Sequence, residues 1–410
     1  MSTSTRGLRS MVRSRGGWLL LTGLVVPRAA STVSVFATSA VLGPDGRGVI
    51  AFVLGTATLV MTAGGFALFI PAVRERQEGS ALVARQYLDL TVFLVVGLDA
   101  LLFLWAVLAP TGLLAPDTAV FIAIIALANA VTVFAQRVLQ ARVSDYEYFA
   151  IGALPAIAST LVLVVFVVIV PDVTDYLILY CALSLATMLW ALVRLRQRVD
   201  LRVIRPYAVV PHLRRAAPTG LSMIGSILVL RGDLTILGLR STEDQVGQYS
   251  MAGSIAGLMF LVAEVFALRA VSAHGAVPTE SYAAVVAGLA RSAVLAVALS
   301  AVPLVGVSWV VLTYLLPDFQ PAFWPTVVLA VAAVASAYTR VVAGGMGMVK
   351  ANRRLYRYAV GSVVLCLLYL PAAAYGALGV AVASLVIYLA QVPIIGGRGA
   401  LARAAAGSRS

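Results

Sequence analysis

The stretch WLLLTGLVVPRAASTVSVFATSAV (residues 18–41) is apolar or weakly polar throughout except for one arginine, Arg28. About 20 such residues are enough for a helix to cross the hydrocarbon core of a bilayer. Similar runs recur along the chain, in which 61% of the residues are hydrophobic and 11% are charged. We therefore predict an all-α polytopic membrane protein. The runs predict twelve spans, at about residues 17–41, 49–73, 88–109, 118–140, 149–170, 176–193, 218–239, 247–268, 285–316, 323–348, 357–375 and 377–395.

The basic residues predict the orientation of these spans. Most of the 30 Lys and Arg residues fall in alternate loops, and only Arg47 and Arg240 fall on the opposite side. Cytoplasmic loops carry an excess of basic residues, so we expect a multi-pass protein of the cell membrane with both termini in the cytoplasm. The net charge of +13 is then a consequence of topology and does not predict binding to nucleic acid.

Two halves of the chain resemble each other. GRGVIAFVLG (46–55) is similar to VGQYSMAGS (246–254), and Phe-Ala-Leu recurs 200 residues apart, at 66–68 and 266–268. ARVSDYEYFAIG (141–152) aligns with ANRRLYRYAVG (351–361). We predict two pseudo-symmetric six-helix bundles, 1–193 and 218–410, joined by a basic cytoplasmic linker, 194–217. Because six is even, the bundles enter the membrane from the same side as parallel repeats.

The arginines inside the predicted spans are the first candidate site residues. A guanidinium near the midplane costs about 2.5–3.5 kcal/mol on insertion scales, so such a residue is a functional candidate by default. Arg28 and Arg231 lie in equivalent spans of the two halves and could face each other across a central cavity. A guanidinium offers phosphate a planar fork of donors. We expect Arg28, Arg231 and Arg340 to bind an anion. The alternatives are an ion pair with Asp99 for Arg28, and contact with lipid headgroups for Arg340.

Other polar residues of the spans are candidates to line the cavity or to bind ions. Thr32 and Ser39 share a helical face with Arg28, and Asn129 and Gln136 belong to a polar stripe on span four. That stripe fits either a sugar-binding cavity or hydrogen bonds to a neighbouring helix. The acids in the predicted spans are either ion-coupling residues or partners of the arginines: Asp99, Asp233 and Glu264. We expect no metal site and no cofactor.

Three motifs carry a resemblance to a known family. LGPDGRGVIAFVLG (42–55), AAPTGLS (216–222) and RGDLTILGLRSTEDQVGQYSMAGSI (231–255) resemble polysaccharide flippases of the multidrug/oligosaccharidyl-lipid/polysaccharide exporter (MOP) superfamily. The resemblance implies a V of two bundles working by alternating access. It also implies a polyprenyl-pyrophosphate-linked oligosaccharide as cargo, with membrane lipids and glycan-assembly enzymes as partners. We expect a monomer that is not an enzyme.

Two other functions are alternatives to this one. A cation-coupled multidrug exporter of the same fold would call for acids in the cavity, whereas span one carries Arg28. An integral membrane enzyme would need a catalytic group outside the bilayer, and the predicted outer loops are short, such as PDVTD (171–175). No G-x-x-x-x-G-K-[ST] phosphate-binding loop is present. The sequence favours an anionic cargo.

Overall fold

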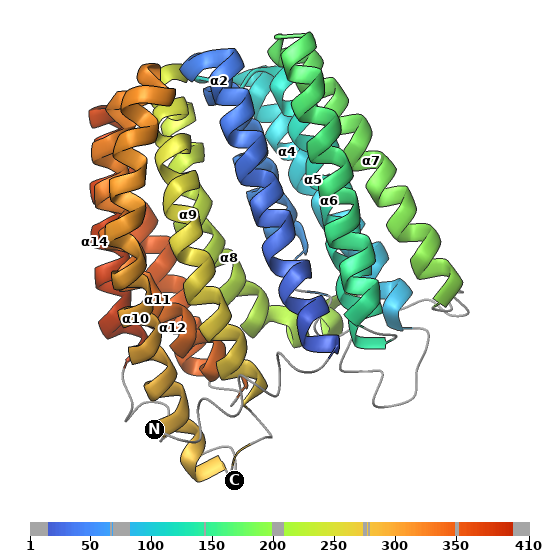
Figure 1. The fold of residues 1–410 in the computed structure, drawn as a ribbon. Helices are drawn as coiled ribbons and strands as arrows, with labels where there is room; N and C mark the ends of the chain where they lie inside the picture. The colour runs from blue at the N-terminus through green and yellow to red at the C-terminus, as the bar shows by residue number, and fades with distance from the viewer. Residues whose placement is uncertain are drawn as a thin grey trace. The chain divides into compact units, whose positions relative to one another are not determined.

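A computed structural model of the chain describes residues 15–65, 68, 83–142, 145–198, 209–273, 277, 279–348 and 352–396. Almost all of these residues are helical (Figure 1). Within them, ten helices are long and apolar enough to cross a membrane. Two of the ten, Val25–Gly65 and Arg354–Ile395, have 41 and 42 residues, about twice the length that one span needs. The prediction of a helical multi-pass protein is therefore confirmed, and the count of twelve spans stays a prediction.

Both long segments are interrupted at a glycine with a positive φ. Helix α2 (Arg15–Gly65) has non-helical dihedral angles at Gly43, where φ is 66°. Gly376, with φ 64°, separates the stretch formed by α12 (Asn352–Cys366), α13 (Tyr369–Ala372) and η4 (Ala373–Tyr375) from α14 (Gly376–Ile395). Only glycine adopts such angles without steric cost. The breaks lie close to the predicted boundaries between spans one and two and between spans eleven and twelve.

The chain divides into two compact units. The first unit contains residues up to Leu42, Val60–Pro110 and Ala115–Ala217. It includes the first part of α2 and four further helices: α4 (Val83–Leu108), α5 (Pro116–Arg142), α6 (Asp145–Ile169) and α7 (Val173–Arg198). Helix α5 packs against α4, α6 and α7. The core of this unit gathers Tyr87 of α4, Phe134 of α5 and Leu195 of α7.

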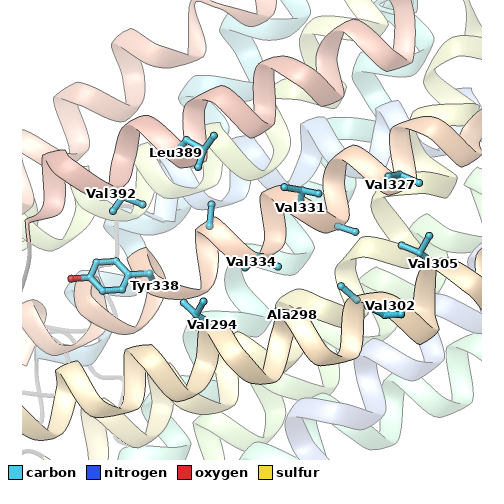
Figure 2. Close-up of a pocket in the computed structure, with 13 residues that line it drawn as sticks. Val294, Ala298, Val302, Val305, Val327, Val331, Val334, Tyr338, Leu389 and Val392 are labelled. Atoms are coloured by element: carbon cyan, nitrogen blue, oxygen red, sulfur yellow. The ribbon is translucent and has the colours of Figure 1, made fainter.

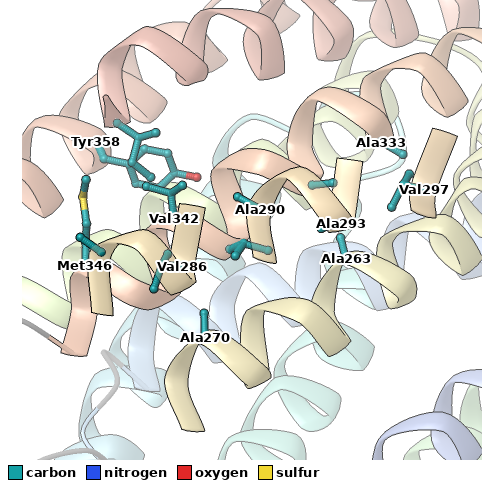
Figure 3. Close-up of a cluster of buried hydrophobic side chains, with 14 of the residues drawn as sticks. Ala263, Ala270, Val286, Ala290, Ala293, Val297, Ala333, Val342, Met346 and Tyr358 are labelled. Carbon is teal, nitrogen blue, oxygen red and sulfur yellow. The ribbon is translucent and has the colours of Figure 1, made fainter. Parts of the chain in front are cut away.

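The second unit contains Gly43–Leu59, Thr111–Leu114 and the chain from Pro218 onward. Its helices are α8 (Val209–Arg240, from Pro218), α9 (Glu243–Ser272), α10 (Thr279–Val310) with η2 (Val311–Leu315), η3 (Pro317–Ala322), α11 (Phe323–Met348) and α12 to α14. Helix α11 packs against α9, α10 and α14. Figure 3 shows its alanine-rich core, which includes Ala263, Ala290 and Ala333. Small residues let helix backbones approach closely where lipid offers no hydrophobic driving force.

The helices extend into the segment that was predicted as a linker. Helix α7 continues to Arg198, and α8 begins at Val209. The part of the predicted linker between them, 199–208, lies outside the described residues, as do Phe66 and Ala67 of the first Phe-Ala-Leu motif. Arg47 was expected in an outer loop, but it lies on α2 and is only 6% exposed.

Residues 43–59 join the second unit through an unusually close backbone contact. A Cβ placed on Gly48 would lie 2.0 Å from the carbonyl oxygen of Glu243, and one on Gly247 would lie 2.0 Å from that of Pro44. The contact is reciprocal, since 199 residues separate both Pro44 from Glu243 and Gly48 from Gly247. This offset of 199 residues is one residue shorter than the 200 residues that separate the two Phe-Ala-Leu motifs. The same region is fixed by Arg47, whose Nε and Nη2 donate to Ser250 Oγ at 3.1 and 2.9 Å.

Candidate functional site

Arg28 is exposed on α2 in the first unit. It forms no ion pair with any residue that the structure describes. The hydroxyl of Thr32, which was expected to line the cavity on the same face as Arg28, donates to the Arg28 carbonyl oxygen at 2.9 Å. Ser39 is 2% exposed, and its hydroxyl has no hydrogen-bond partner in the described part of the chain. The hydroxyl of Thr32 thus binds the backbone and not the Arg28 guanidinium.

The polar stripe of α5 is used partly for packing. Gln136 Nε2 donates to the Tyr148 carbonyl oxygen of α6 at 3.0 Å, and Thr132 donates to the Ala128 carbonyl oxygen at 2.8 Å. Asn129 is half-buried. The hydrogen bond from Gln136 is an interhelical bond of the kind that polar residues form in membranes.

Asp99 of α4 is 7% exposed, and its Oδ1 has no hydrogen-bond partner among the residues described. Glu264 of α9, in the second unit, is half-buried. Neither carboxylate takes part in an ion pair within the described ranges. A buried carboxylate without a partner is costly to keep ionised. A proton or a cation would therefore stabilise Asp99 at this buried position.

Asp233 of α8 is the centre of a buried hydrogen-bond network in the second unit. One carboxylate oxygen accepts from the Leu234 N–H at 2.7 Å, and the other accepts from the Tyr249 hydroxyl of α9. Tyr249 and Tyr369 each lie 3.1 Å from Ser384 Oγ, and the Tyr369 hydroxyl donates to the Val229 carbonyl oxygen at 3.0 Å. The network links α8, α9, α13 and α14, and every side chain in it is less than 10% exposed. Both oxygens of Asp233 thus have protein donors.

Arg340 of α11 contacts aromatic rings. Its guanidinium carbon lies 4.7 Å from the ring centroid of Phe260, whose ring packs against that of Tyr388 with centroids 5.8 Å apart. A cation over an aromatic face is attracted by the ring quadrupole. Arg340 Nε has no hydrogen-bond partner in the described ranges, so this donor remains available. Arg231 of α8 is half-buried, and its carbonyl oxygen accepts from the Thr235 hydroxyl at 3.1 Å.

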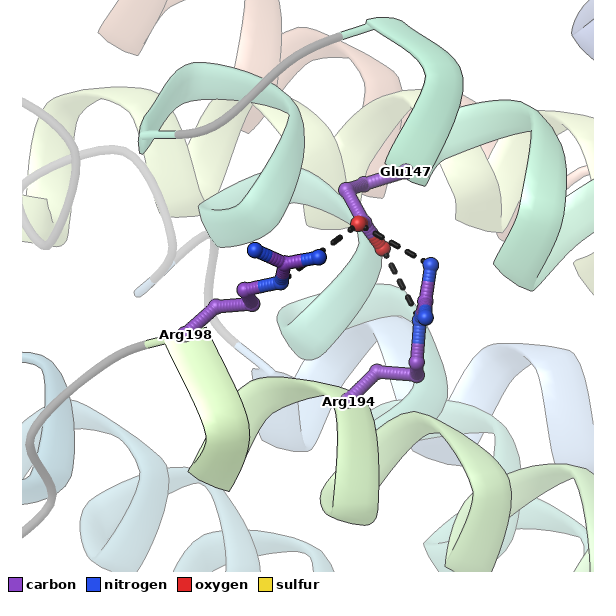
Figure 4. A network of polar contacts seen from close by, with 3 residues as sticks. All are labelled: Glu147, Arg194 and Arg198. Atoms are coloured by element: carbon purple, nitrogen blue, oxygen red, sulfur yellow. Dashed lines mark hydrogen bonds and ion pairs between the residues drawn. The ribbon is translucent and has the colours of Figure 1, made fainter.

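A charge cluster between α6 and α7 of the first unit was not predicted from the sequence. Glu147 of α6 accepts two hydrogen bonds from Arg194 of α7, at 3.0 and 3.1 Å, and lies 4.0 Å from Arg198 (Figure 4). The Glu147 side chain is 3% exposed. Arg194 also stacks on Trp190, 5.5 Å from its ring centroid. This geometry fastens α7 to α6 and indicates a structural role.

No model of a protein family and no curated protein matches the chain. Solved structures do match over nearly its full length. The lipid II flippase MurJ in an inward closed conformation has a TM-score of 0.67 at 11% identity, covering 96% of this chain and 91% of that one. An inward-facing multidrug resistance MATE transporter of the MOP superfamily also has a TM-score of 0.67, at 12% identity and with 95% and 99% coverage. This chain has the MOP fold. A MATE structure in complex with MaL6 agrees, with a TM-score of 0.65, 13% identity and 98% and 99% coverage.

The MOP fold joins transporters and flippases, so the fold alone leaves the cargo open. The resemblance predicted from the sequence is confirmed at the level of the superfamily fold. Sequence reasoning missed the partners Tyr249, Tyr369 and Ser384. One signal was available, because a tyrosine within an apolar helix normally needs a hydrogen-bond partner for its hydroxyl. Two such tyrosines and one acid in the second half could have suggested a shared network.

Proposed function

We propose that the chain is a flippase that moves a polyprenyl-pyrophosphate-linked oligosaccharide from the cytoplasmic to the outer leaflet of the cell membrane. It works by alternating access of two six-helix bundles with twelve spans in total, and both termini face the cytoplasm. The glycine breaks at Gly43 and Gly376 support this count, because each divides a helix of double length. The fold shared with a lipid II flippase supports the class of activity.

The observation that carries the proposal is the state of Arg28. Its guanidinium lies in an apolar helix, is exposed, and has no carboxylate partner in the part of the chain that the structure describes. Ionisable residues in membrane spans are retained where they bind something. A pyrophosphate supplies the missing negative charge, and Arg is the side chain best matched to phosphate geometry.

Arg231 and Arg340 are proposed to contribute to pyrophosphate binding as well. Arg340 Nε has no hydrogen-bond partner among the residues that the structure describes, and the guanidinium carbon lies 4.7 Å from the Phe260 ring centroid, which favours a cation at this place. Ser39 and Asn129 are proposed as sugar contacts. Thr32 and Gln136 are weaker candidates, because their hydrogen-bonding groups already serve backbone carbonyls.

The alternative function is a cation-coupled multidrug exporter, and two buried acids favour it. Asp99 has an oxygen without a hydrogen-bond partner in the described part of the chain, and Asp233 is a buried acid that accepts a hydrogen bond from the Tyr249 hydroxyl. Either carboxylate could take up a proton. In the flippase proposal they are structural partners.

The test is transport by the purified chain in vesicles loaded with a fluorescent polyprenyl-pyrophosphate sugar, with the potential set by potassium and valinomycin. Each charge crossing 100 mV gains about 2.3 kcal/mol, so a cargo with two charges gains about 4–5 kcal/mol. Arg28→Ala should abolish flipping at normal protein abundance, and Arg28→Lys should restore it partly. Arg240→Ala, which removes an exposed arginine at the end of α8, is the matched control.

Two results would contradict the proposal. Unchanged flipping in Arg28→Ala would show that Arg28, on which the proposal rests, does not bind the cargo. Transport of a cationic dye that follows a proton gradient and is lost in Asp233→Asn, with no movement of the lipid-linked sugar, would establish the exporter instead.

A further inference from the structure

An apolar groove runs along the surface of the second unit between α10, α11 and α14. Its volume is about 610 Å³, within the range of ligand pockets. Valine and alanine side chains line it almost entirely (Figure 2). Val305 and Val327 lie at one end, while Val294, Val392 and Tyr338 lie at the other, where the Tyr338 hydroxyl is the one hydroxyl of the lining.

An arginine follows the groove at its tyrosine end. The α10 residues of the lining include Val294, Ala298 and Val305, which recur at helical spacing. Arg291 lies three residues before Val294 and seven before Ala298, so it continues the same helical face. Arg291 is exposed and forms no hydrogen bond or ion pair with any residue in the described ranges.

Aromatic side chains place Arg291 at the level of a membrane surface. Trp309 and Trp324 are 45% and 64% exposed near the far end of α10 and the start of α11, as in the aromatic belt of an interface. Arg291 precedes Trp309 by 18 residues of helix, which is about 27 Å at 1.5 Å per residue. The hydrocarbon core is about 30 Å thick. Arg291 therefore lies near the opposite interface, where lipid phosphates are found.

The length of the groove matches one leaflet. From Val294 to Val305 the helix rises roughly 16 Å, about half of the hydrocarbon core. In a bilayer the only solvent available to fill such a groove is hydrocarbon. Arg291 at the interfacial end of the groove favours a lipid with one negative charge. A single guanidinium compensates the charge of a phosphodiester but only part of the charge of a pyrophosphate.

We propose that this groove is a binding site for one anionic glycerophospholipid of the leaflet at the N-terminal end of α10. An acyl chain lies along the valines and alanines, the phosphate binds Arg291, and the Tyr338 hydroxyl donates to the headgroup region. The site is separate from the residues proposed to bind the cargo, so it stands whether or not the chain is a flippase.

The test is native mass spectrometry of the purified full chain titrated with phosphatidylglycerol or with phosphatidylcholine of the same acyl chains. The chain should retain phosphatidylglycerol in preference. Arg291→Gln should weaken that binding about fivefold, the factor expected from one basic residue near an anionic surface, and should leave phosphatidylcholine unchanged. Ala298→Trp should weaken both by filling the groove.

Matched controls separate the site from general effects. Arg196→Gln removes an exposed arginine at the end of α7, and Leu299→Trp introduces the same tryptophan side chain beside the groove, at a position that is 67% exposed. Both should bind lipid as the parent chain does.

Three results would overturn the proposal. The first is equal retention of the two lipids, or equal effects of Arg291→Gln and Arg196→Gln. The second is a dimer that Ala298→Trp dissociates, which would make the groove an interface between copies. The third is displacement of phosphatidylglycerol by a polyprenyl pyrophosphate with an affinity that depends on Ala298, which would assign the groove to the cargo tail. Because Arg291 is exposed, Arg291→Gln should fold as the parent chain does, so the proposal can be tested even if Ala298→Trp fails to fold.

Discussion

The backbone contact between Gly48 and Glu243 makes a sharp prediction about stability. Gly48→Ala would place a Cβ 2.0 Å from the Glu243 carbonyl oxygen, whereas ordinary contact begins near 3.4 Å. The obstacle is helix backbone, which cannot rotate away, so the helices must separate. Overpacking of this kind costs about 1–3 kcal/mol. Alanine returns about 0.5–1 kcal/mol because it is the better helix former. The midpoints of these two ranges leave a net loss of about 1 kcal/mol, and we expect the same for Gly247→Ala by the reciprocal geometry.

Gly253→Ala is the matched control, because a Cβ on this α9 glycine would meet nothing within 4 Å. It should leave the chain as stable as the parent or slightly more stable. The measurement is the thermal inactivation rate of each purified variant in one detergent, since membrane proteins commonly unfold irreversibly and are then compared by rate. If Gly48→Ala and Gly247→Ala are no less stable than Gly253→Ala, the close contact does not exist in the protein.

Two further predictions concern buried polar contacts. Tyr249→Phe should destabilise the chain by about 1–2 kcal/mol, because it leaves an oxygen of Asp233 buried without its donor; an unfolding titration that shows no change would contradict the network. Glu147→Gln should cost about 3 kcal/mol, because Arg194 loses a carboxylate that is 3% exposed. Asp89→Asn, which breaks the partly exposed i,i+4 pair with Arg85 at 2.7 Å, should cost less than about 0.5 kcal/mol, and equal losses in the two unfolding curves would refute the distinction.

The helices could be predicted from the sequence because a membrane span has a strong and local signal. Long apolar runs are enough to mark them, and helices α4 to α11 each overlap one predicted span over most of its length. The turn residues were informative too, since LGPDG contains Gly43, at which α2 breaks. The similarity of GRGVIAFVLG to VGQYSMAGS also anticipated that the two segments occupy related positions, and the structure adds that they touch through Gly48 and Gly247.

The partners of the polar residues could not be predicted, because helical periodicity gives the face of a residue but not the helix opposite. Asp233 was expected to couple ions or to pair with an arginine, yet its hydroxyl donor is Tyr249, on the next helix. Thr32 shares a face with the Arg28 side chain, but the nearest acceptor for its hydroxyl is the carbonyl of its own helix, a common choice for threonine in apolar surroundings. Whether Arg28 binds pyrophosphate stays a prediction.

The polar groups of the second unit fall into two kinds, and the difference decides where a ligand is needed. Asp233 has one donor on its own helix and one on α9, so the cost of burying it is met inside the protein and no ligand is required for stability. Arg291 has no partner in the described part of the chain and is exposed beside an apolar groove, so any compensating charge must come from outside the protein. Arg28 in the first unit is likewise exposed and has no ion-pair partner in the described part of the chain. An arginine that the protein leaves without an acid beside apolar surface is stabilised when an anion binds it. The two arginines nonetheless differ in what they accompany. Arg291 continues a hydrocarbon groove at headgroup depth, which suits a resident lipid. Arg28 lies near the middle of its predicted span, where a phosphate arrives only as part of a cargo.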